Sequence, residues 1–182
     1  MFRTRSPTTN KVQIDYADAM KLTNEVVGSY GALLVANNKA GKPNVMTIGW
    51  ATCGIIWSKP MMVVLVRPSR HTYEFIDQAD SFTVNLPPPE MADAATYCGT
   101  VSGRDFDKFK EKSLTPLPGK GVSASYIDEC VVHFECRIVH KNHILPQYLA
   151  PDIAKGSYPQ GDYHVVYYGE ILGCYKEEHY RL

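Results

Sequence analysis

The chain has 182 residues, and its 19 lysines and arginines balance 19 aspartates and glutamates to a formal net charge of zero. This balance argues against the broad basic surface with which proteins bind nucleic acid or anionic membranes, so we expect neither partner. No apolar run approaches the roughly 20 residues of a membrane span. The basic N-terminus lacks the apolar segment of a secretion signal, so we expect a cytoplasmic protein with a single domain, 1–182.

Apolar runs separated by turn residues predict the elements of the first half of the chain. The expected strands are 30–37, 44–51, 55–66 and 81–86, and the expected helix is 72–78. The turn-forming segment 38–43 joins the first two strands, which indicates a β-hairpin. Ser58-Lys59-Pro60 punctuates the third strand, and three prolines end the fourth.

The second half of the chain is dominated by two further strands. Residues 130–140 alternate apolar and polar side chains, which is typical of a half-exposed strand, and 163–173 supply the last strand. Residues 90–112 read as helical pieces and 114–119 as a loop. Between the two strands, 143–162 are rich in proline, glycine and tyrosine, which favours a long covering loop.

Six strands, mostly linked by short turns, favour an antiparallel barrel or sandwich over a doubly wound parallel sheet. The expected fold is therefore mainly β, with a few short helices. The sequence contains no G-x-G-x-x-G motif, so it lacks the Rossmann dinucleotide fingerprint.

A basic corner follows the strand that ends at residue 66. Arg67, Ser69, Arg70, His71 and Thr72 gather two guanidiniums, an imidazole and two hydroxyls at a strand-to-helix junction. A helix start offers unpaired N–H groups and arginine offers a fork suited to phosphate oxygens, so this corner is a candidate anion site. The alternative is a basic surface loop whose serine or threonine only caps the helix.

A second group of polar residues lies upstream, at the end of one strand and in the turn after it. Thr47, Thr52 and Cys53 can form hydrogen bonds, Trp50 can stack on a flat ring, and Gly54 lets a ligand approach the backbone. Beside a phosphate clamp, these residues would suit a phosphorylated aromatic cofactor. The alternative is an ordinary strand with an aromatic anchor.

The five cysteines are odd in number, widely spaced and contain no C-x-x-C. This spacing argues against a disulfide framework, a zinc site or an iron–sulfur cluster, and we expect no metal site. We expect Cys98, Cys130, Cys136 and Cys174 to be small core residues.

Several motifs, in this order and spacing, resemble the flavin reductase-like, FMN-binding split-barrel family, and in particular its flavoredoxin branch. These motifs are Asn44-Val-Met-Thr-Ile-Gly-Trp50, Ser58-Lys-Pro60, Arg67-Pro-Ser-Arg-His-Thr-Tyr73, Phe82-Thr-Val-Asn85, Thr100-Val-Ser-Gly-Arg-Asp-Phe-Asp-Lys-Phe109 and Gly169-Glu-Ile-Leu172. The resemblance runs from about 25 to 175, which leaves 1–24 as an N-terminal extension. It implies a six-stranded antiparallel split β-barrel that forms a homodimer, with FMN at the interface.

Carried over by position, the resemblance assigns two sets of cofactor-binding residues. Thr47, Trp50, Ala51, Thr52, Cys53 and Gly54 would approach the flavin, while Arg67, Ser69, Arg70, His71 and Thr72 would serve the phosphate and ribityl. Asn85 matches a position near the cofactor, although a turn residue fits equally well there. The segment 102–108 resembles a loop near the flavin, and its alternative is a capped surface helix. Many relatives carry serine or threonine where Cys53 falls, so the thiol could alter the flavin potential.

The leading hypothesis for function is an FMN-dependent oxidoreductase, in which the cofactor carries the electron chemistry and NADH or NADPH is the candidate donor. We expect no hydrolytic triad and find none in the sequence. Two alternatives stay open: a non-catalytic FMN electron carrier that exchanges electrons with a redox partner protein, and a binding module for another phosphorylated ligand.

Overall fold

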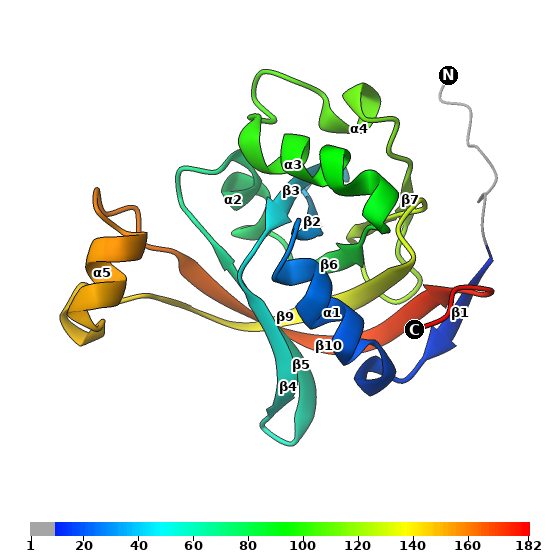
Figure 1. Ribbon diagram of the computed structural model, residues 1–182, viewed down its shortest axis with the longest axis horizontal. Helices are drawn as coiled ribbons and strands as arrows, with labels where there is room; N and C mark the ends of the chain where they lie inside the picture. Colours follow the sequence, from blue (N-terminus) through cyan, green and yellow to red (C-terminus); the bar gives the residue numbers. More distant parts are fainter. Residues whose placement is uncertain (1–9) are drawn as a thin grey trace.

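The computed structural model describes residues 10–182 as one curved antiparallel sheet with short helices packed around it (Figure 1). The strands of the large sheet are β1 (Lys11–Ile14), β2 (Ala32–Asn37), β3 (Pro43–Ile48), β4 (Ala51–Ile56), β5 (Lys59–Val66), β6 (Ser81–Leu86), β9 (Val132–His143) and β10 (Val165–Glu177). A separate small sheet pairs β7 (Pro116–Pro118) with β8 (Ser125–Ile127). The α-helices are α1 (Met20–Val27), α2 (His71–Ile76), α3 (Ala92–Thr100), α4 (Lys108–Glu111) and α5 (Pro151–Ser157). Three 3-10 helices are η1 (Tyr16–Ala19), η2 (Pro89–Met91) and η3 (Pro146–Tyr148).

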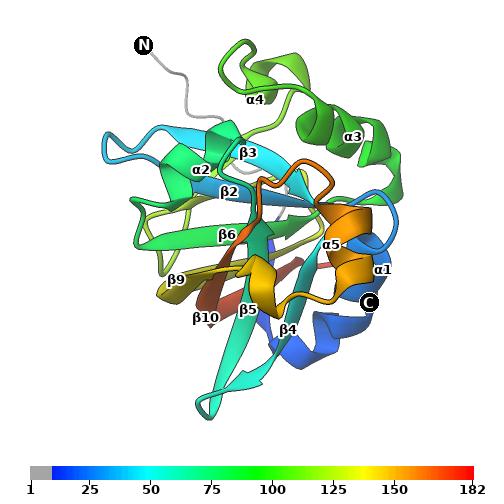
Figure 2. The same cartoon turned by 90° about the vertical axis from the view of Figure 1, so that its left-hand side faces the viewer.

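The large sheet begins and ends with strands that are neighbours in the chain. Its order is β3-β2-β6-β9-β10-β5-β4, with β1 paired to β10, and the paired strands run antiparallel. Only Gly49 and Trp50 separate β3 from β4, although these strands lie at opposite ends of the order. The sheet curls far enough for β3 to contact β5 (Figure 2). The predicted antiparallel split barrel is confirmed, with its opening between β3 and β4.

The strand count differs from the six expected, because the large sheet has eight strands. The region from 55 to 66 is a hairpin, β4–β5, rather than one long strand. Its turn falls on Trp57 and Ser58, both with left-handed backbone angles, φ 53° and 57°. Two left-handed residues in a two-residue turn match the twist of antiparallel strands, which is why this tight hairpin forms.

The added strand β1 comes from the region that the sequence reading treats as an N-terminal extension. Lys11–Ile14 pair with the end of β10, so this part of the extension belongs to the sheet. Residues 1–9 of the expected extension lie outside the described part of the chain.

The segment 144–164, named here the arm, is partly helical instead of the expected covering loop. It holds η3 and α5 and projects from the barrel (left in Figure 1). Pro151 stands in the first turn of α5, where its missing N–H costs nothing and its fixed φ favours the helix. Prolines that read as loop signals in the sequence therefore start a helix.

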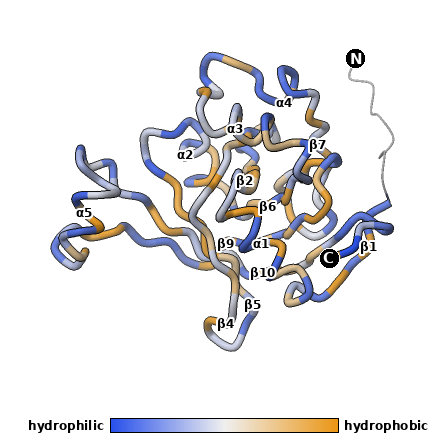
Figure 3. Tube along the Cα trace, viewed as in Figure 1, coloured by the Kyte–Doolittle hydropathy of each residue, from blue (hydrophilic) through white to orange (hydrophobic). Residues whose placement is uncertain are grey.

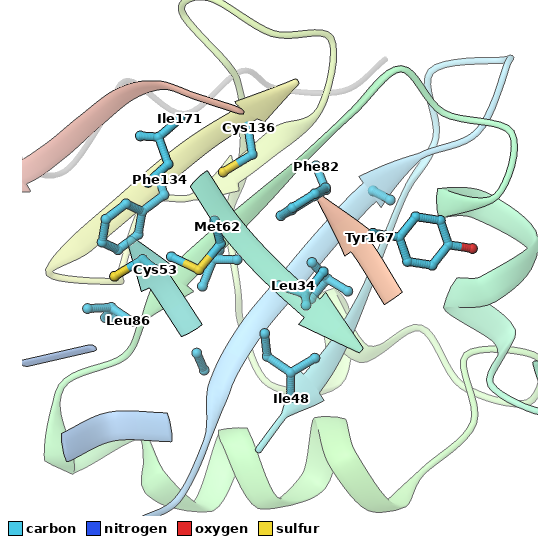
Figure 4. Close-up of a cluster of buried hydrophobic side chains, with 14 of the residues drawn as sticks. Leu34, Ile48, Cys53, Met62, Phe82, Leu86, Phe134, Cys136, Tyr167 and Ile171 are labelled. Carbon is cyan, nitrogen blue, oxygen red and sulfur yellow. The ribbon is translucent and has the colours of Figure 1, made fainter. Parts of the chain in front are cut away.

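The core lies inside the barrel, with a smaller apolar cluster between β2, β3 and α3. Figure 3 shows the apolar stretches concentrated on the strands. In Figure 4, Cys53 lies near Phe134 and Leu86 within the main cluster. All five cysteines are free and buried, which confirms the packing role expected for Cys98, Cys130, Cys136 and Cys174.

Described helices include none that is long and apolar enough to cross a membrane.

Asn85 is a structural residue that joins the small sheet to the barrel. Its side chain is fully buried on β6, where Nδ2 donates to the Leu33 carbonyl at 3.0 Å and to Thr83 Oγ1 at 2.9 Å. Its Oδ1 accepts from the Ile127 N–H at 2.9 Å. Because these bonds occupy both ends of the amide, the sequence-based expectation that Asn85 contacts a cofactor does not fit its position.

Replacing Asn85 with alanine should lower the free energy of unfolding by about 1–3 kcal/mol, since the buried Ile127 N–H would lose its acceptor. Urea unfolding of parent and variant measures this difference. The exposed Asn142, replaced in the same way, is the control and should change stability by less than about 0.5 kcal/mol. Equal effects at the two positions would contradict the structural role of Asn85.

Candidate functional site

Two hollows meet at the opening of the barrel, and both have Met46 and Arg70 in their walls. The first hollow is lined by Met46, Thr47, Ile48, Gly49, Trp50, Leu65, Arg67, Arg70 and His164. The second hollow is lined by Met46, 69–72, 98–104 and Lys108. The volume of the first hollow is about 190 Å³ and that of the second is about 160 Å³. The split of the sheet therefore produces a continuous, two-part binding surface.

The first hollow has an aromatic wall. Trp50, on the two-residue link between β3 and β4, keeps 44% of its surface exposed. Its ring lies 4.8 Å from that of His164 and 6.1 Å from that of Tyr158, measured between centroids. Met46, Ile48 and Leu65 add apolar surface. A flat ligand with polar edges fits such a wall.

His164 is a neutral hydrogen-bonding group in this wall. It is buried, and its Nδ1 lies 2.8 Å from the hydroxyl of Tyr158. Burial lowers the pKa of His164 to about 4, and the nearby positive charge of Arg67 acts in the same direction. The imidazole is thus uncharged at pH 7, where its ring nitrogens can each take part in one neutral hydrogen bond.

The second hollow concentrates positive charge. Among residues 10–182, Arg70, Arg104 and Lys108 line it, and no carboxylate does. Arg70 donates to the Gly99 carbonyl at 3.3 Å, and Arg104 donates to the Ser69 carbonyl at 3.3 Å while pairing with Glu74. Three cations in the lining of one hollow, with no carboxylate in that lining, suit an anionic ligand.

Lys108 is the buried member of this set. Only 5% of its surface is exposed, and its Nζ donates to the carbonyls of Cys98 at 2.7 Å and Val45 at 3.1 Å. Burial lowers the pKa of Lys108, and the charge of Arg70 lowers it further. The two carbonyls use two of the three ammonium donors, so the lysine both ties α3 to β3 and places positive charge under the second hollow.

The segment 99–104, named here the loop 99–104, comprises the last two residues of α3 and the turn after them; it forms the outer wall of the second hollow and packs tightly on β3 and α2. A Cβ at Gly103 would collide with Oδ1 of Asn44 and lie 3.1 Å from the His71 ring. Asn44 in turn donates from Nδ2 to Thr72 Oγ1 at 2.7 Å, and Thr72 is buried. The hydroxyl of Thr72 therefore holds β3 to α2, and glycine at 103 lets the loop close over this pair.

Arg67 and Ser69 hold the arm. The Arg67 guanidinium donates to the Ser157 carbonyl at 2.8 Å and to the Asp162 carbonyl at 3.1 Å, and it lies 5.0 Å from the centroid of the Tyr158 ring. Ser69 donates from Oγ to Asp162 Oδ2 at 2.5 Å and from its backbone N–H to Oδ1 at 3.3 Å. Part of the basic corner is thus already engaged by the protein itself.

The structure brings together seven of the residues selected from the sequence. Thr47, Trp50, Arg67, Ser69, Arg70, His71 and Thr72 line one or both hollows. Arg70 bridges the hollows, whereas His71 packs edge-on against Phe75 at 5.0 Å, with its Nδ1 3.4 Å from Glu74 Oε2. The predicted link between the two sequence segments is therefore present in the fold.

The residues expected on β4 lie elsewhere. Cys53 is buried in the barrel core, where burial raises the pKa of its thiol, so its sulfur does not face either hollow. Alternation along the strand turns its neighbours Thr52 and Gly54 to the outer face, and Ala51 packs against the core. Within the described chain, none of these four residues lines either hollow.

Sequence reasoning missed His164, and it included Arg104 and Lys108 only as members of the segment 102–108, without assigning either a role. The motif that includes residues 102–108 was the available signal for Arg104 and Lys108, but a lysine in a polar helix reads as solvent-exposed. Nothing in the local sequence marks His164, because the turn that precedes it and the ring of Trp50 meet only in the folded chain.

Comparisons with known proteins identify relatives of this architecture. An uncharacterised protein of Archaeoglobus fulgidus is 35% identical over 98 residues, which are 54% of this chain and 55% of that protein. The chain spans about half the length of the curated relatives it matches. A flavoredoxin structure from Methanosarcina acetivorans is 33% identical with a TM-score of 0.66, covering 84% of this chain and 70% of that one.

A structure described as an FMN-binding domain of a flavin reductase-like enzyme from Shewanella baltica OS155 has a TM-score of 0.67. It is 19% identical and covers 93% of this chain and 78% of that chain, so it supports the fold alone. A family model, described as the flavin reductase like domain, matches residues 28–181. Since this match covers most of the chain, including both hollows and the whole arm, the chain belongs to the flavin reductase-like family.

Proposed function

We propose that this protein binds FMN across the two hollows and acts as a flavin-dependent oxidoreductase. The observation that carries the proposal is the contact between a hollow lined by three cations and a hollow with an aromatic wall, joined at Arg70. A phosphorylated ring compound needs these two environments side by side. Membership of the flavin reductase-like family and similarity to a flavoredoxin support the choice of a flavin.

The residues of the second hollow suit the phosphate. Arg70 and Arg104 offer guanidinium forks, and Lys108 adds a buried positive charge. The fit is also steric, because glycine at 99 and 103 keeps the loop close to β3 and leaves its backbone accessible to a ligand. Phosphate oxygens bound by such groups gain charge-assisted hydrogen bonds, which are roughly twice as strong as neutral ones.

The residues of the first hollow suit the ring. Trp50, Met46 and Leu65 would hold its faces and exclude water, while neutral His164 would offer a hydrogen bond to a polar edge. Bound FMN would supply the hydride and electron transfer; the protein supplies position and electrostatics. Because Tyr158 bonds the other side of the imidazole, it orients His164 in the wall.

The proposal takes NADH or NADPH as the electron donor, and a small molecule or a redox partner protein as the acceptor. It also includes a homodimer with the cofactor beside the interface. Support for the dimer comes from the β4–β5 hairpin, where Ile55 and Trp57 are 63% and 60% exposed and β4 pairs on one side with β5. Exposed aromatic residues of this kind are enriched at interfaces.

Purified protein should bind FMN with a visible flavin absorbance, and catalytic amounts should oxidise NADH or NADPH steadily when an acceptor is present. Spectroscopic titration and the decay of nicotinamide absorbance measure the two properties separately. Flavin binding without nicotinamide oxidation would leave a non-catalytic electron carrier. Failure to bind flavin, together with binding of another phosphorylated compound, would overturn the proposed function.

Replacing Arg70 with alanine should weaken FMN binding about ten- to a hundredfold, which corresponds to roughly 1.5–3 kcal/mol for a lost charge-assisted contact. Riboflavin lacks the phosphate, so its affinity should fall much less. Quenching of flavin fluorescence gives both dissociation constants. The exposed Arg181, replaced by alanine, controls for the loss of a positive charge. Equal losses for FMN and riboflavin would show that Arg70 does not contact the phosphate.

Replacing Trp57 with serine should shift the protein from dimer to monomer, because it removes the largest exposed aromatic side chain of the hairpin. Light scattering at micromolar concentration measures the mass. The exposed Tyr148 on the arm, replaced by serine, is the matched control and should leave the mass unchanged. A monomeric parent that binds FMN normally would contradict the proposed dimer.

A further inference from the structure

We infer that Asp162 sets the selectivity of this site between phosphorylated and unphosphorylated flavins by acting as an internal anion at the basic corner. The inference rests on the proposed function, since it concerns the same phosphate site. The expected effect of Asp162 on affinity is negative: its charge weakens the binding of FMN. Without its charge the protein should hold FMN more tightly and release it less readily.

The contacts of the Asp162 carboxylate are those expected of a bound anion. One oxygen accepts from the hydroxyl of Ser69 at 2.5 Å, and the other lies 3.3 Å from the backbone nitrogen of the same residue. Ser69 lines the second hollow next to Arg70. The carboxylate therefore occupies two donors that a phosphate in this hollow would otherwise receive.

The arm holds the carboxylate at this position by its backbone. Gly161 and Asp162 have left-handed angles, φ 78° and 55°, and Gly161 N–H bonds the Tyr158 carbonyl at 3.1 Å to close the turn. Arg67 fixes both ends of this turn through the carbonyls of Ser157 and Asp162. Asp162 is consequently presented to Ser69 by a turn that is anchored independently of the carboxylate.

A phosphate entering the second hollow meets this charge in one of two ways. It can bind beside the carboxylate and incur like-charge repulsion, or it can displace the carboxylate from Ser69 and expose it to water. Both routes reduce the net gain from phosphate binding. Riboflavin carries no phosphate, so its affinity does not depend on Asp162. The expected consequence is that bound FMN exchanges with free FMN in solution instead of remaining permanently bound.

The test is the Asp162→Asn variant, which keeps a hydrogen-bond acceptor for Ser69 but removes the negative charge. Its FMN affinity should rise about three- to tenfold at low ionic strength, as expected for one charge several ångströms from a phosphate. Its riboflavin affinity should stay within twofold of the parent. Quenching of flavin fluorescence measures both ligands, and far-UV circular dichroism checks that the variant is folded.

Two controls separate the charge effect from a general change in the arm. Asp152→Asn removes a carboxylate from the exposed first turn of α5 and should leave both affinities unchanged. Repeating the titrations in about 0.5 M salt should shrink the gain of Asp162→Asn, because exposed charges are screened within a few ångströms there. If Asp162→Asn does not fold, Asp162→Ser carries the same test.

The outcomes distinguish this inference from the proposed function. A parent that binds FMN, with an Asp162→Asn variant of equal or weaker FMN affinity, overturns the role of Asp162 and leaves the proposed function standing. A gain that is the same for FMN and riboflavin also overturns it, because the phosphate would then be irrelevant. A parent that binds no flavin overturns both.

Discussion

The opening of the barrel between β3 and β4 is the constraint on which the rest of the site depends. These strands follow one another in the chain with two residues between them, yet they form opposite ends of the sheet order. A closed barrel would have paired them and filled the space with core side chains. Because they diverge, Trp50 remains exposed at the split and the walls of β3 and β5 border a hollow. The segments that follow β5 and α3 then supply the walls of the second hollow.

The candidate site has a positively charged part and an aromatic part. Positive charge gathers where the loop 99–104 approaches the corner after β5, and the aromatic wall stands on the other side of Arg70. The chain as a whole is neutral, so this local charge is a product of placement and not of composition. Burial of Lys108 strengthens the effect, since a charge surrounded by protein is screened less than one in water.

The arm contacts both parts of the candidate site through short, specific interactions. Arg67 and Ser69 hold its base, while Tyr158 and His164 form part of the aromatic wall. The same segment thus contributes a wall to one hollow and a carboxylate to the rim of the other. Under the proposed function, the arm would therefore contribute to the ring site through Tyr158 and His164 and to the phosphate site through Asp162, on different residues of one segment.

The sequence by itself determined the class of the fold and the β2–β3 hairpin, and it singled out 47–50 and 67–72, most of which line the two hollows, because periodicity, turn chemistry and motif order are local properties. It could not determine which side chains of the basic corner are free to bind a ligand and which are already bonded to other parts of the protein. Ser69 and Arg67 bind the arm, and Thr72 binds Asn44, through partners that lie 28 to 95 positions away in the chain. Only the tertiary structure could turn Cys53 into the core, bury Lys108 beneath the second hollow and set His164 against Trp50. The physical reason is that burial and pairing depend on contacts between distant segments, which no local pattern records.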